Sequence, residues 1–490
     1  MPRLGQKIVS GVVWTSVEMF GRDGTNLVVF MILANILGPE AIGLMALATA
    51  APVILSIPVQ QGFPDAIVQR GTIDELHLDS VFWLLLAIGA VLSGLLWLGA
   101  GAIAATLGQP ELEEITHWTS LIVVINAFGA IPGAYLRRHL QFKLFAIRTI
   151  LGIVISGMVG IAMALSGYGI WSLVVMGLLR PFLESLFVFI FSAWRPRLQY
   201  SFSRCQEFVQ YSAPLAMQAF VRIFNDELPK VILGTLVSPS ASGIYVLALK
   251  PLTLLTNMLV GPLTRVTMPA VSRLEGDAVR IGRYFDIAVR LISIVAVPAF
   301  LGFAAITPLL VTALLGDEWL PVITPIQILM LLGMMRCIDG VSSSIILALG
   351  NSRLLLFFHL AYTAMGLVLF TLAAQFGIAM TVGAIVACNY ILLPFFLYKV
   401  WELARIDVLQ PLRRFPYILL CTTIMLAAVL GVQQLLSERL PSSALLFVCT
   451  AAGVVSYGIA ALVLLRSDLV MAWGILSDTL GRRRRLDVPE

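Results

Sequence analysis

The stretch LGPEAIG, residues Leu37–Gly43, recurs as VSPSASG at Val237–Gly243, with proline, alanine and glycine in matching places at an offset of 200 residues. The same offset pairs Arg22 with Arg222, and each of these arginines stands within an apolar segment. Matching turns that accompany matching arginines indicate a duplicated unit. The sequence therefore predicts two related halves.

The composition places both halves in a membrane. Of the 490 residues, 59% are hydrophobic and 12% are charged, whereas soluble domains are about half apolar and about a quarter charged. We count fourteen apolar segments near the roughly 20-residue length that spans a bilayer as an α-helix. A β-barrel would alternate over short strands, so the expected fold class is an all-α polytopic membrane protein.

The distribution of basic residues predicts the orientation. Of the 32 lysines and arginines, we place 25 on the side of the N-terminus, one (Arg439) opposite and six within spans. This positive-inside pattern predicts that both termini are cytoplasmic. The net charge of +5 then reflects topology, and we expect no nucleic-acid partner. The expected parts are six-helix lobes over 1–200 and 201–405, two further helices over 406–470 and a basic cytoplasmic tail over 471–490.

The segment from Arg222 to Lys230 contains four ionisable groups in an otherwise apolar run. Arg222, Asp226 and Lys230 are four residues apart, so they share one stripe of a helix, with Glu227 beside it. At roughly 3 kcal/mol per charge, uncompensated groups at mid-bilayer would cost on the order of 10 kcal/mol. We therefore interpret this segment as the wall of a polar cavity.

Other predicted spans also contain charges. Arg180 and Glu184 are one turn apart in the sixth span, and we interpret them as an internal pair that holds helices together. Lys250 has no carboxylate within a turn, which makes it a candidate anion binder. We predict that Arg22, Arg222, Lys230, Lys250 and Arg336 bind the substrate, and that Glu18, Asp23, Asp226, Glu227 and Asp339 balance these charges or couple transport to an ion.

Nothing in the sequence indicates an enzyme. No phosphate-binding loop of the G-x-x-x-x-G-K-[ST] type is present, and the four histidines and five cysteines have no metal-ligand spacing. We expect no catalytic residue, no metal and no cofactor. The buried charges balance only when all are ionised, so H⁺ or Na⁺ coupling is our hypothesis for the driving force.

Several motifs resemble those of the Wzx-type polysaccharide transporters, which are lipid-linked oligosaccharide flippases of the multidrug/oligosaccharidyl-lipid/polysaccharide exporter superfamily. Within this family, the sequence most resembles the subgroup that serves exopolysaccharides of the colanic-acid type. Asn35 departs from the family, because many relatives have arginine there. The motifs are ILANILGPEAIGL at 32–44, QGF at 61–63, AIVQ at 66–69, LRRHLQFK at 136–143, GYGIWSLV at 167–174, PAVSR at 269–273 and LGDEW at 315–319.

This resemblance implies two pseudo-symmetric six-helix lobes of the MATE-like fold with two additional helices. It also implies flipping of an undecaprenyl-diphosphate-linked oligosaccharide across the bacterial inner membrane by alternating access, for exopolysaccharide or lipopolysaccharide synthesis. The expected partners are the lipid-linked substrate, the bilayer and a polymerase or other glycan-assembly proteins, and we expect a monomer. Two rival functions remain, a MATE-like multidrug exporter and a membrane-embedded glycan polymerase or ligase.

Overall fold

The computed structural model describes residues 2–274, 277–471 and 474, and every regular element in this part of the chain is a helix. The chain forms two compact units. One comprises Met1–Val246 with Phe370–Thr381, and the other comprises Leu247–Leu369 with Val382–Glu490. The predicted basic tail over 471–490 lies outside the described residues except at 471 and 474, so that prediction is not tested.

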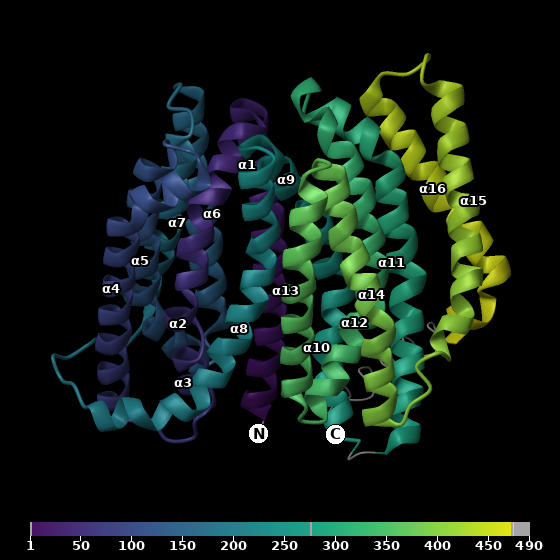
Figure 1. The fold of residues 1–490 in the computed structure, drawn as a ribbon. Coiled ribbons are helices and arrows are strands. Elements are labelled where there is room, and N and C mark those ends of the chain that lie inside the picture. The colour runs from purple at the N-terminus through teal and green to yellow at the C-terminus, as the bar shows by residue number, and fades with distance from the viewer. Residues whose placement is uncertain (1, 275–276, 472–473, 475–490) are drawn as a thin grey trace. The chain divides into compact units, whose positions relative to one another are not determined.

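The first unit is built from long antiparallel helices (Figure 1). The pairs α4 and α5, α6 and α7, α5 and α7, and α1 and α6 pack side by side. The elements are α1 (Pro2–Leu55), α2 (Ile57–Gln60), α3 (Phe63–Gln69), α4 (Glu75–Leu107), α5 (Leu112–Arg138), α6 (Phe142–Leu165), α7 (Trp171–Phe191), α8 (Phe202–Leu236) and the start of α9 (Pro239–Leu255).

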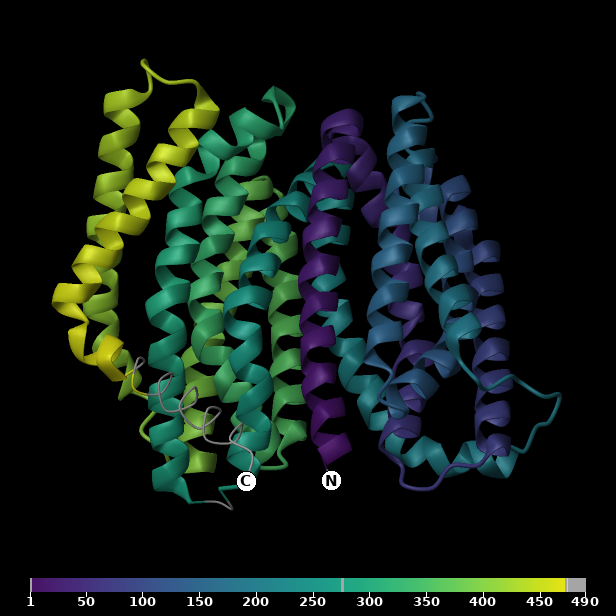
Figure 2. The ribbon, with the colours of Figure 1, turned by 180° about the vertical axis from the view of Figure 1, so that it is seen from behind.

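The long helix α1 is interrupted at Gly38 (Figure 2). Its backbone there has φ 73° and ψ 175°, a conformation that glycine adopts without strain. Pro39 follows directly and cannot donate a backbone hydrogen bond to the preceding turn. The helix therefore consists of two segments, one on each side of the predicted turn.

The two copies of the repeated stretch cross each other within the first unit. A Cβ atom added at Gly43 would lie 1.7 Å from the Pro239 carbonyl oxygen, and one added at Gly243 would lie 1.9 Å from the Pro39 carbonyl oxygen. The Cβ added at Gly43 would also lie 3.0 Å from the backbone nitrogen of Gly243, and the Cβ added at Gly243 would lie 3.0 Å from the backbone nitrogen of Gly43. The contact is reciprocal, as expected for two copies of one duplicated element.

The second unit contains the rest of α9 and a bundle in which α11 packs against α12, α15 and α16. Its apolar core includes Val297, Cys421 and Leu465. The elements are η1 (Thr256–Val260), α10 (Gly261–Ser272), α11 (Ala278–Leu314), η2 (Asp317–Val322), α12 (Ile323–Ala348), α13 (Ser352–Ala374), α14 (Ile378–Ala404), η3 (Pro411–Arg414), α15 (Phe415–Leu436) and α16 (Ser442–Leu464). The end of α13, residues 370–374, and the start of α14, residues 378–381, belong to the first unit.

Twelve helical segments of the described residues are long and apolar enough to cross a membrane. One of them, Glu18–Leu55, contains the break at Gly38 and so two of the predicted spans. The 35-residue α8 is not among the twelve, and it contains the charged segment that ends at Lys230. Both parts of α1 and α8 lie where the sequence predicts spans, so the described helices agree approximately with the predicted fourteen. The protein is a multi-pass membrane protein.

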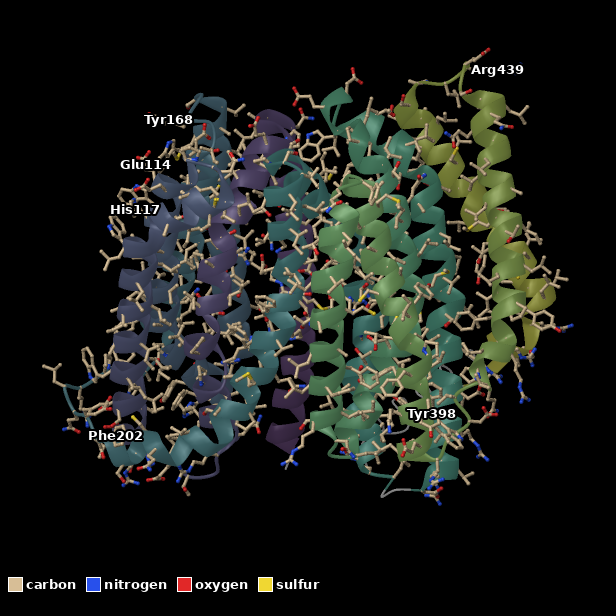
Figure 3. The ribbon with its side chains drawn as sticks, in the orientation of Figure 1. Glu114, His117, Tyr168, Phe202, Tyr398 and Arg439 are labelled. Atoms are coloured by element: carbon tan, nitrogen blue, oxygen red, sulfur yellow. The ribbon has the colours of Figure 1, made fainter. Side chains whose placement is uncertain are left out.

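Figure 3 labels side chains that lie at opposite ends of each unit. In the first unit, Glu114, His117 and Tyr168 lie at one end and Phe202 lies at the other. In the second unit, Arg439 and Tyr398 likewise lie toward opposite ends. Aromatic and charged residues are thus found toward the ends of both units, as is typical of the boundaries of a bilayer.

Candidate functional site

A polar pocket of about 340 Å³ lies between α5, α6 and α7 in the first unit, and we call it the arginine pocket. Three arginines and one glutamate are among the residues that line it, a set of charges that is rare within membrane-spanning helices. The lining residues are Gln60, Asn126, Gly129, Ala130, Gly133, Arg137, Phe145, Arg148, Arg180, Pro181, Glu184 and Ser185.

Arg180 and Glu184 form the ion pair expected from their spacing on α7, with Nε of the arginine 3.0 Å from Oε1 of the glutamate. Arg180 also donates a hydrogen bond of 3.1 Å to Oδ1 of Asn26 on α1. The pair is therefore internal, as predicted, but it also faces the pocket. The Arg180 guanidinium thus links α7 to α1, the helix that carries the predicted first-span cluster.

Arg148 on α6 is the most enclosed of the three arginines, with 15% of its side chain exposed. Its guanidinium carbon lies 4.0 Å from the ring centroid of Phe145, a cation–π contact that fixes the orientation of the group. One of its terminal nitrogens lies 3.9 Å from Oε2 of Glu184. Its Nε is buried without a hydrogen-bond partner among the described residues.

Arg137 and Arg138 end α5 and have different roles. Arg138 donates to the carbonyl oxygens of Ile67 at 2.8 Å and Gly71 at 2.8 Å, and so satisfies backbone groups after α3. Arg137 faces the pocket instead, with NH1 3.7 Å from Oδ1 of Asp65. Its Nε is also buried and lacks a partner in the described part of the chain.

Two glycines create the space in which these groups meet. A Cβ at Gly152 would lie 2.8 Å from Cγ of Glu184, so the glutamate occupies the place of a missing side chain on α6. A Cβ at Gly129 would lie 2.3 Å from Oγ of Ser185, which lets α5 approach α7 closely. Small residues of this kind allow close helix packing in membranes. The pocket is therefore formed by the close packing of α5, α6 and α7.

The predicted first-span cluster contains an ion pair between two neighbouring residues. Nε of Arg22 lies 3.0 Å from Oδ1 of its neighbour Asp23. Glu18 lies one turn earlier on α1. Neither Arg22 nor Asp23 is among the residues described as lining the arginine pocket.

The predicted cluster on α8 divides into two parts. Nζ of Lys230 lies 2.6 Å from Oε1 of Glu227, and this pair is largely buried. Arg222 and Asp226, on the same helix, are exposed. Lys230 thus pairs with the residue three positions earlier, although Asp226 shares its stripe. Asn225, whose carbonyl precedes Pro229 by one turn, is buried.

Lys250 and Arg336, the other predicted substrate-binding cations, lie in the second unit. Both are partly buried. One terminal nitrogen of Arg336 lies 3.8 Å from Oδ2 of Asp339, and the Ser343 hydroxyl lies 3.5 Å from Oδ1 of the same carboxylate. The polar patch expected on this helix is present, and its role in binding remains a prediction.

The sequence did not single out Arg137 and Arg148 as pocket residues. Both stand near span ends, where a basic residue is expected to contact lipid headgroups. The available signal was the pairing of Phe145 with Arg148 three residues later on one helix face. That spacing is common, so only the packing of α5, α6 and α7 identifies the pocket.

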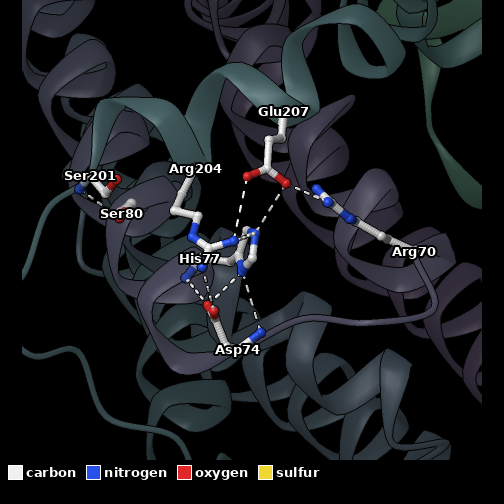
Figure 4. Close-up of polar contacts among 7 residues, drawn as sticks. All are labelled: Arg70, Asp74, His77, Ser80, Ser201, Arg204 and Glu207. Carbon is white, nitrogen blue, oxygen red and sulfur yellow. Dashed lines mark hydrogen bonds and ion pairs between the residues drawn. The ribbon is translucent and has the colours of Figure 1, made fainter.

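A second polar cluster links α3 and α4 to the first turns of α8 (Figure 4). Asp74 caps α4, accepting from the His77 backbone at 2.9 Å, and its side chain lies 2.5 Å from Nδ1 of that histidine. Glu207 on α8 pairs with Arg70, and Arg204 lies 3.2 Å from Asp74. Burial raises the pKa of Asp74, but the His77 hydrogen bonds and the Arg204 charge outweigh it and lower that pKa overall.

Relatives with assigned roles act in polysaccharide synthesis. The chain is 25% identical over 79% of its length to the teichuronic acid biosynthesis protein TuaB of Bacillus subtilis, covering 80% of that protein. It is 24% identical over 70% of its length to the lipopolysaccharide biosynthesis protein WzxC of Escherichia coli, covering 70% of it. It is also 23% identical to the succinoglycan biosynthesis transport protein ExoT of Rhizobium meliloti, with 65% of each chain covered.

Solved structures share the fold. The lipid II flippase MurJ in an inward closed conformation matches 94% of this chain and 100% of its own, with a TM-score of 0.80 and 16% identity. An inward-facing MATE multidrug transporter matches 81% of this chain and 99% of its own, with a TM-score of 0.63 and 17% identity.

The sequence profile described as "Polysaccharide biosynthesis protein" matches residues 32–324. With this match extending over more than half of its length, the chain belongs to the polysaccharide biosynthesis protein family.

Proposed function

We propose that this protein flips an undecaprenyl-diphosphate-linked oligosaccharide from the cytoplasmic to the outer leaflet of a bacterial inner membrane, for exopolysaccharide or lipopolysaccharide synthesis. The observation that carries the proposal is the arginine pocket, in which three guanidiniums stand within a membrane-spanning unit. A guanidinium holds two phosphate oxygens at once, and exclusion of water strengthens that contact. The same three charges would repel an organic cation, which argues against multidrug export.

The relatives support the same proposal. One named relative is a transport protein for succinoglycan synthesis, and the MurJ structure with the same fold is that of a lipid II flippase. The outward connectors of the fourteen-span topology are short, which disfavours a polymerase or ligase that must hold acceptor sugars outside the membrane. The basic residues on the N-terminal side support cytoplasmic termini.

The proposed mechanism is alternating access with the lipid tail remaining in the bilayer. Arg22, Arg222 and Lys230 of the first unit, with Lys250 and Arg336 of the second, would contact the diphosphate and sugars during passage. The paired carboxylates, such as Glu227 beside Lys230, would keep these cations ionised between turnovers. Uptake of H⁺ or Na⁺ by one carboxylate would raise the affinity for an anion, and transport in vesicles that ignores both ions would exclude this coupling.

A deletion strain tests the function. Without this protein, the lipid-linked repeat unit should accumulate on the cytoplasmic face, because synthesis continues while export stops. The measurement is the fraction of that lipid open to an impermeant glycosidase in right-side-out and inverted vesicles. Restoration of export by the wild-type gene, and failure by Arg222→Ala at equal membrane abundance, is the expected pattern. Normal polymer export in the deletion strain would refute the function, and normal export by the arginine variant would refute only the residue's role.

A further inference from the structure

We propose that a groove between α5 and α7 binds a membrane lipid with an ammonium headgroup, of the phosphatidylethanolamine class. The groove has a volume of about 600 Å³ and shares no lining residue with the arginine pocket. We call it the lipid groove. The inference does not depend on the proposed function, because it follows from the shape and charge of the first unit alone.

The lipid groove has the length of one bilayer leaflet. The helices α5 and α7 begin at the same end of the first unit, where Glu114 and Tyr168 lie (Figure 3). One face of α5 from Glu114 to Ile125 and one face of α7 from Trp171 to Phe182 line the groove. Each face extends over roughly 16 Å at the 1.5 Å rise per residue of an α-helix. This length is close to half of the roughly 30 Å hydrocarbon core of a bilayer.

A contact between the two helices closes the deep end of the lipid groove. The Ser185 hydroxyl on α7 donates a hydrogen bond of 3.0 Å to the carbonyl oxygen of Ile125 on α5. Gly129 permits this approach, because a Cβ there would lie 2.3 Å from the same hydroxyl oxygen. The side of the groove is open, since Trp118 is 45% exposed and Phe182 is 50% exposed. An acyl chain can therefore enter from the side and extend as far as this contact.

The walls of the lipid groove suit a hydrocarbon chain. Apart from Glu114, its described lining consists of aliphatic and aromatic side chains such as Leu121 and Leu178. Walls of this kind offer a sugar almost no hydrogen-bonding groups, whereas an acyl chain fills them by apolar contact. The occupant we infer is therefore a lipid chain with its headgroup at the end where the helices begin.

Glu114 selects the headgroup. It stands in the first turn of α5, is exposed, and forms no ion pair with any residue that the structure describes. A carboxylate at this place attracts an ammonium group and repels a headgroup with net negative charge. The groove thus favours phosphatidylethanolamine over phosphatidylglycerol. It also disfavours the diphosphate-linked lipid of the proposed function, so it is distinct from the transport path.

Two tryptophans flank the position of the headgroup. Trp118 follows Glu114 by one turn on the same face of α5. An edge-to-face contact with Trp97 on α4, with the ring centroids 6.4 Å apart, holds its ring in place. Trp171 is the first residue of α7 and lines the groove from the other side. A tryptophan ring attracts an ammonium group by its face and donates through its N–H to lipid oxygens.

Native mass spectrometry of the full-length protein tests the headgroup preference. The protein is released from nanodiscs that contain equal amounts of phosphatidylethanolamine and phosphatidylglycerol with identical acyl chains, and the ratio of the two bound lipids is measured. We expect the wild type to retain an excess of phosphatidylethanolamine. Glu114→Gln should lower this ratio by about twofold to fivefold, the range expected for loss of an exposed ion pair.

Glu113→Gln is the matched control, because Glu113 belongs to the same turn of α5 but lies toward α4. A Cβ added at Gly101 of α4 would be 3.2 Å from its Oε1, and Glu113 does not line the groove. The control should leave the lipid ratio unchanged. The melting temperature of each variant shows whether it is folded.

Photolabelling of the wild type locates the bound lipid and needs no substitution. A phosphatidylethanolamine with a photoreactive group on its acyl chain should label peptides of α5 and α7, and excess unlabelled phosphatidylethanolamine should prevent the labelling more effectively than phosphatidylglycerol does. Three results would each overturn the inference: equal retention of both lipids by the folded wild type, the same change in both glutamate variants, and labelling that leaves α5 and α7 unmodified.

Discussion

At the scale of single residues, the buried charges divide into ion pairs within one helix and groups that face a pocket. Glu227 and Lys230 form a close pair on α8, with 10% and 20% of their side chains exposed. A buried pair gains little net stability over apolar residues, but removing one partner leaves the other charge without compensation. This pair is therefore the clearest place to separate a structural role from a role in binding.

Glu227→Gln should lower the free energy of unfolding by about 3 kcal/mol, because Lys230 would remain buried and unpaired. Replacing both residues, Glu227→Leu with Lys230→Met, should restore most of that loss. Denaturant titration in mixed micelles measures the difference. The matched control is Glu402→Gln, which breaks the exposed Lys399–Glu402 pair of the same i, i+3 spacing and should cost less than about 1 kcal/mol. Equal losses in the two single variants would contradict this account.

The candidate site was only partly predictable from the sequence. The Arg180–Glu184 pair follows from a spacing of four residues on one helix. Arg137 and Arg148, however, join that pair from two other helices, and no spacing within one segment encodes such a meeting. Their position near span ends also favours the ordinary interpretation as lipid anchors. Tertiary packing through Gly129 and Gly152 supplies the missing information.

At the scale of elements, the repeated stretch explains both a break and a contact. Gly38 interrupts α1 because its positive φ is accessible to glycine at little cost. Five residues later, Gly43 brings the helix backbone against Pro239 at the start of α9. The corresponding glycine of the other copy does the same against Pro39. Each copy thus needs its glycine for the other copy to pack.

Gly43→Ala and Gly243→Ala should each destabilise the protein, because the added methyl carbon would overlap a backbone oxygen that cannot move alone. We expect a loss of about 1–3 kcal/mol, as for overpacked sites. Gly24→Ala is the control on the same helix, since a Cβ there meets nothing within 4 Å, and it should be neutral or stabilising by up to about 1 kcal/mol. Thermal unfolding measures all three, and a stable Gly43→Ala protein would show that the crossing is not close.

The fold was largely predictable at this scale. Apolar length located the spans, and the proline, alanine and glycine shared by the two stretches located the duplication. The sequence did not reveal that the spans on both sides of Gly38 form one interrupted helix, or that α8 crosses the bundle end before running along it (Figure 1). These features depend on neighbouring helices, and local pattern does not encode them.

At the scale of the whole molecule, a duplicated stretch is joined to a charged pocket in the first unit. Three arginines and one glutamate are among the residues that line this pocket. Membership of the polysaccharide biosynthesis protein family agrees with a large, polar substrate. Translocation of such a substrate is the central claim, and it concerns movement between leaflets rather than binding.

The most direct measurement reconstitutes the purified protein in liposomes that contain a fluorescent undecaprenyl-diphosphate-linked oligosaccharide. An impermeant glycosidase added outside reports the fraction of that lipid in the outer leaflet as a function of time. The account predicts that the accessible fraction rises well beyond the half exposed initially, and that Arg222→Ala, when folded, slows the rise. An accessible fraction that stays at the level of protein-free liposomes, with correctly folded protein present, would contradict the account.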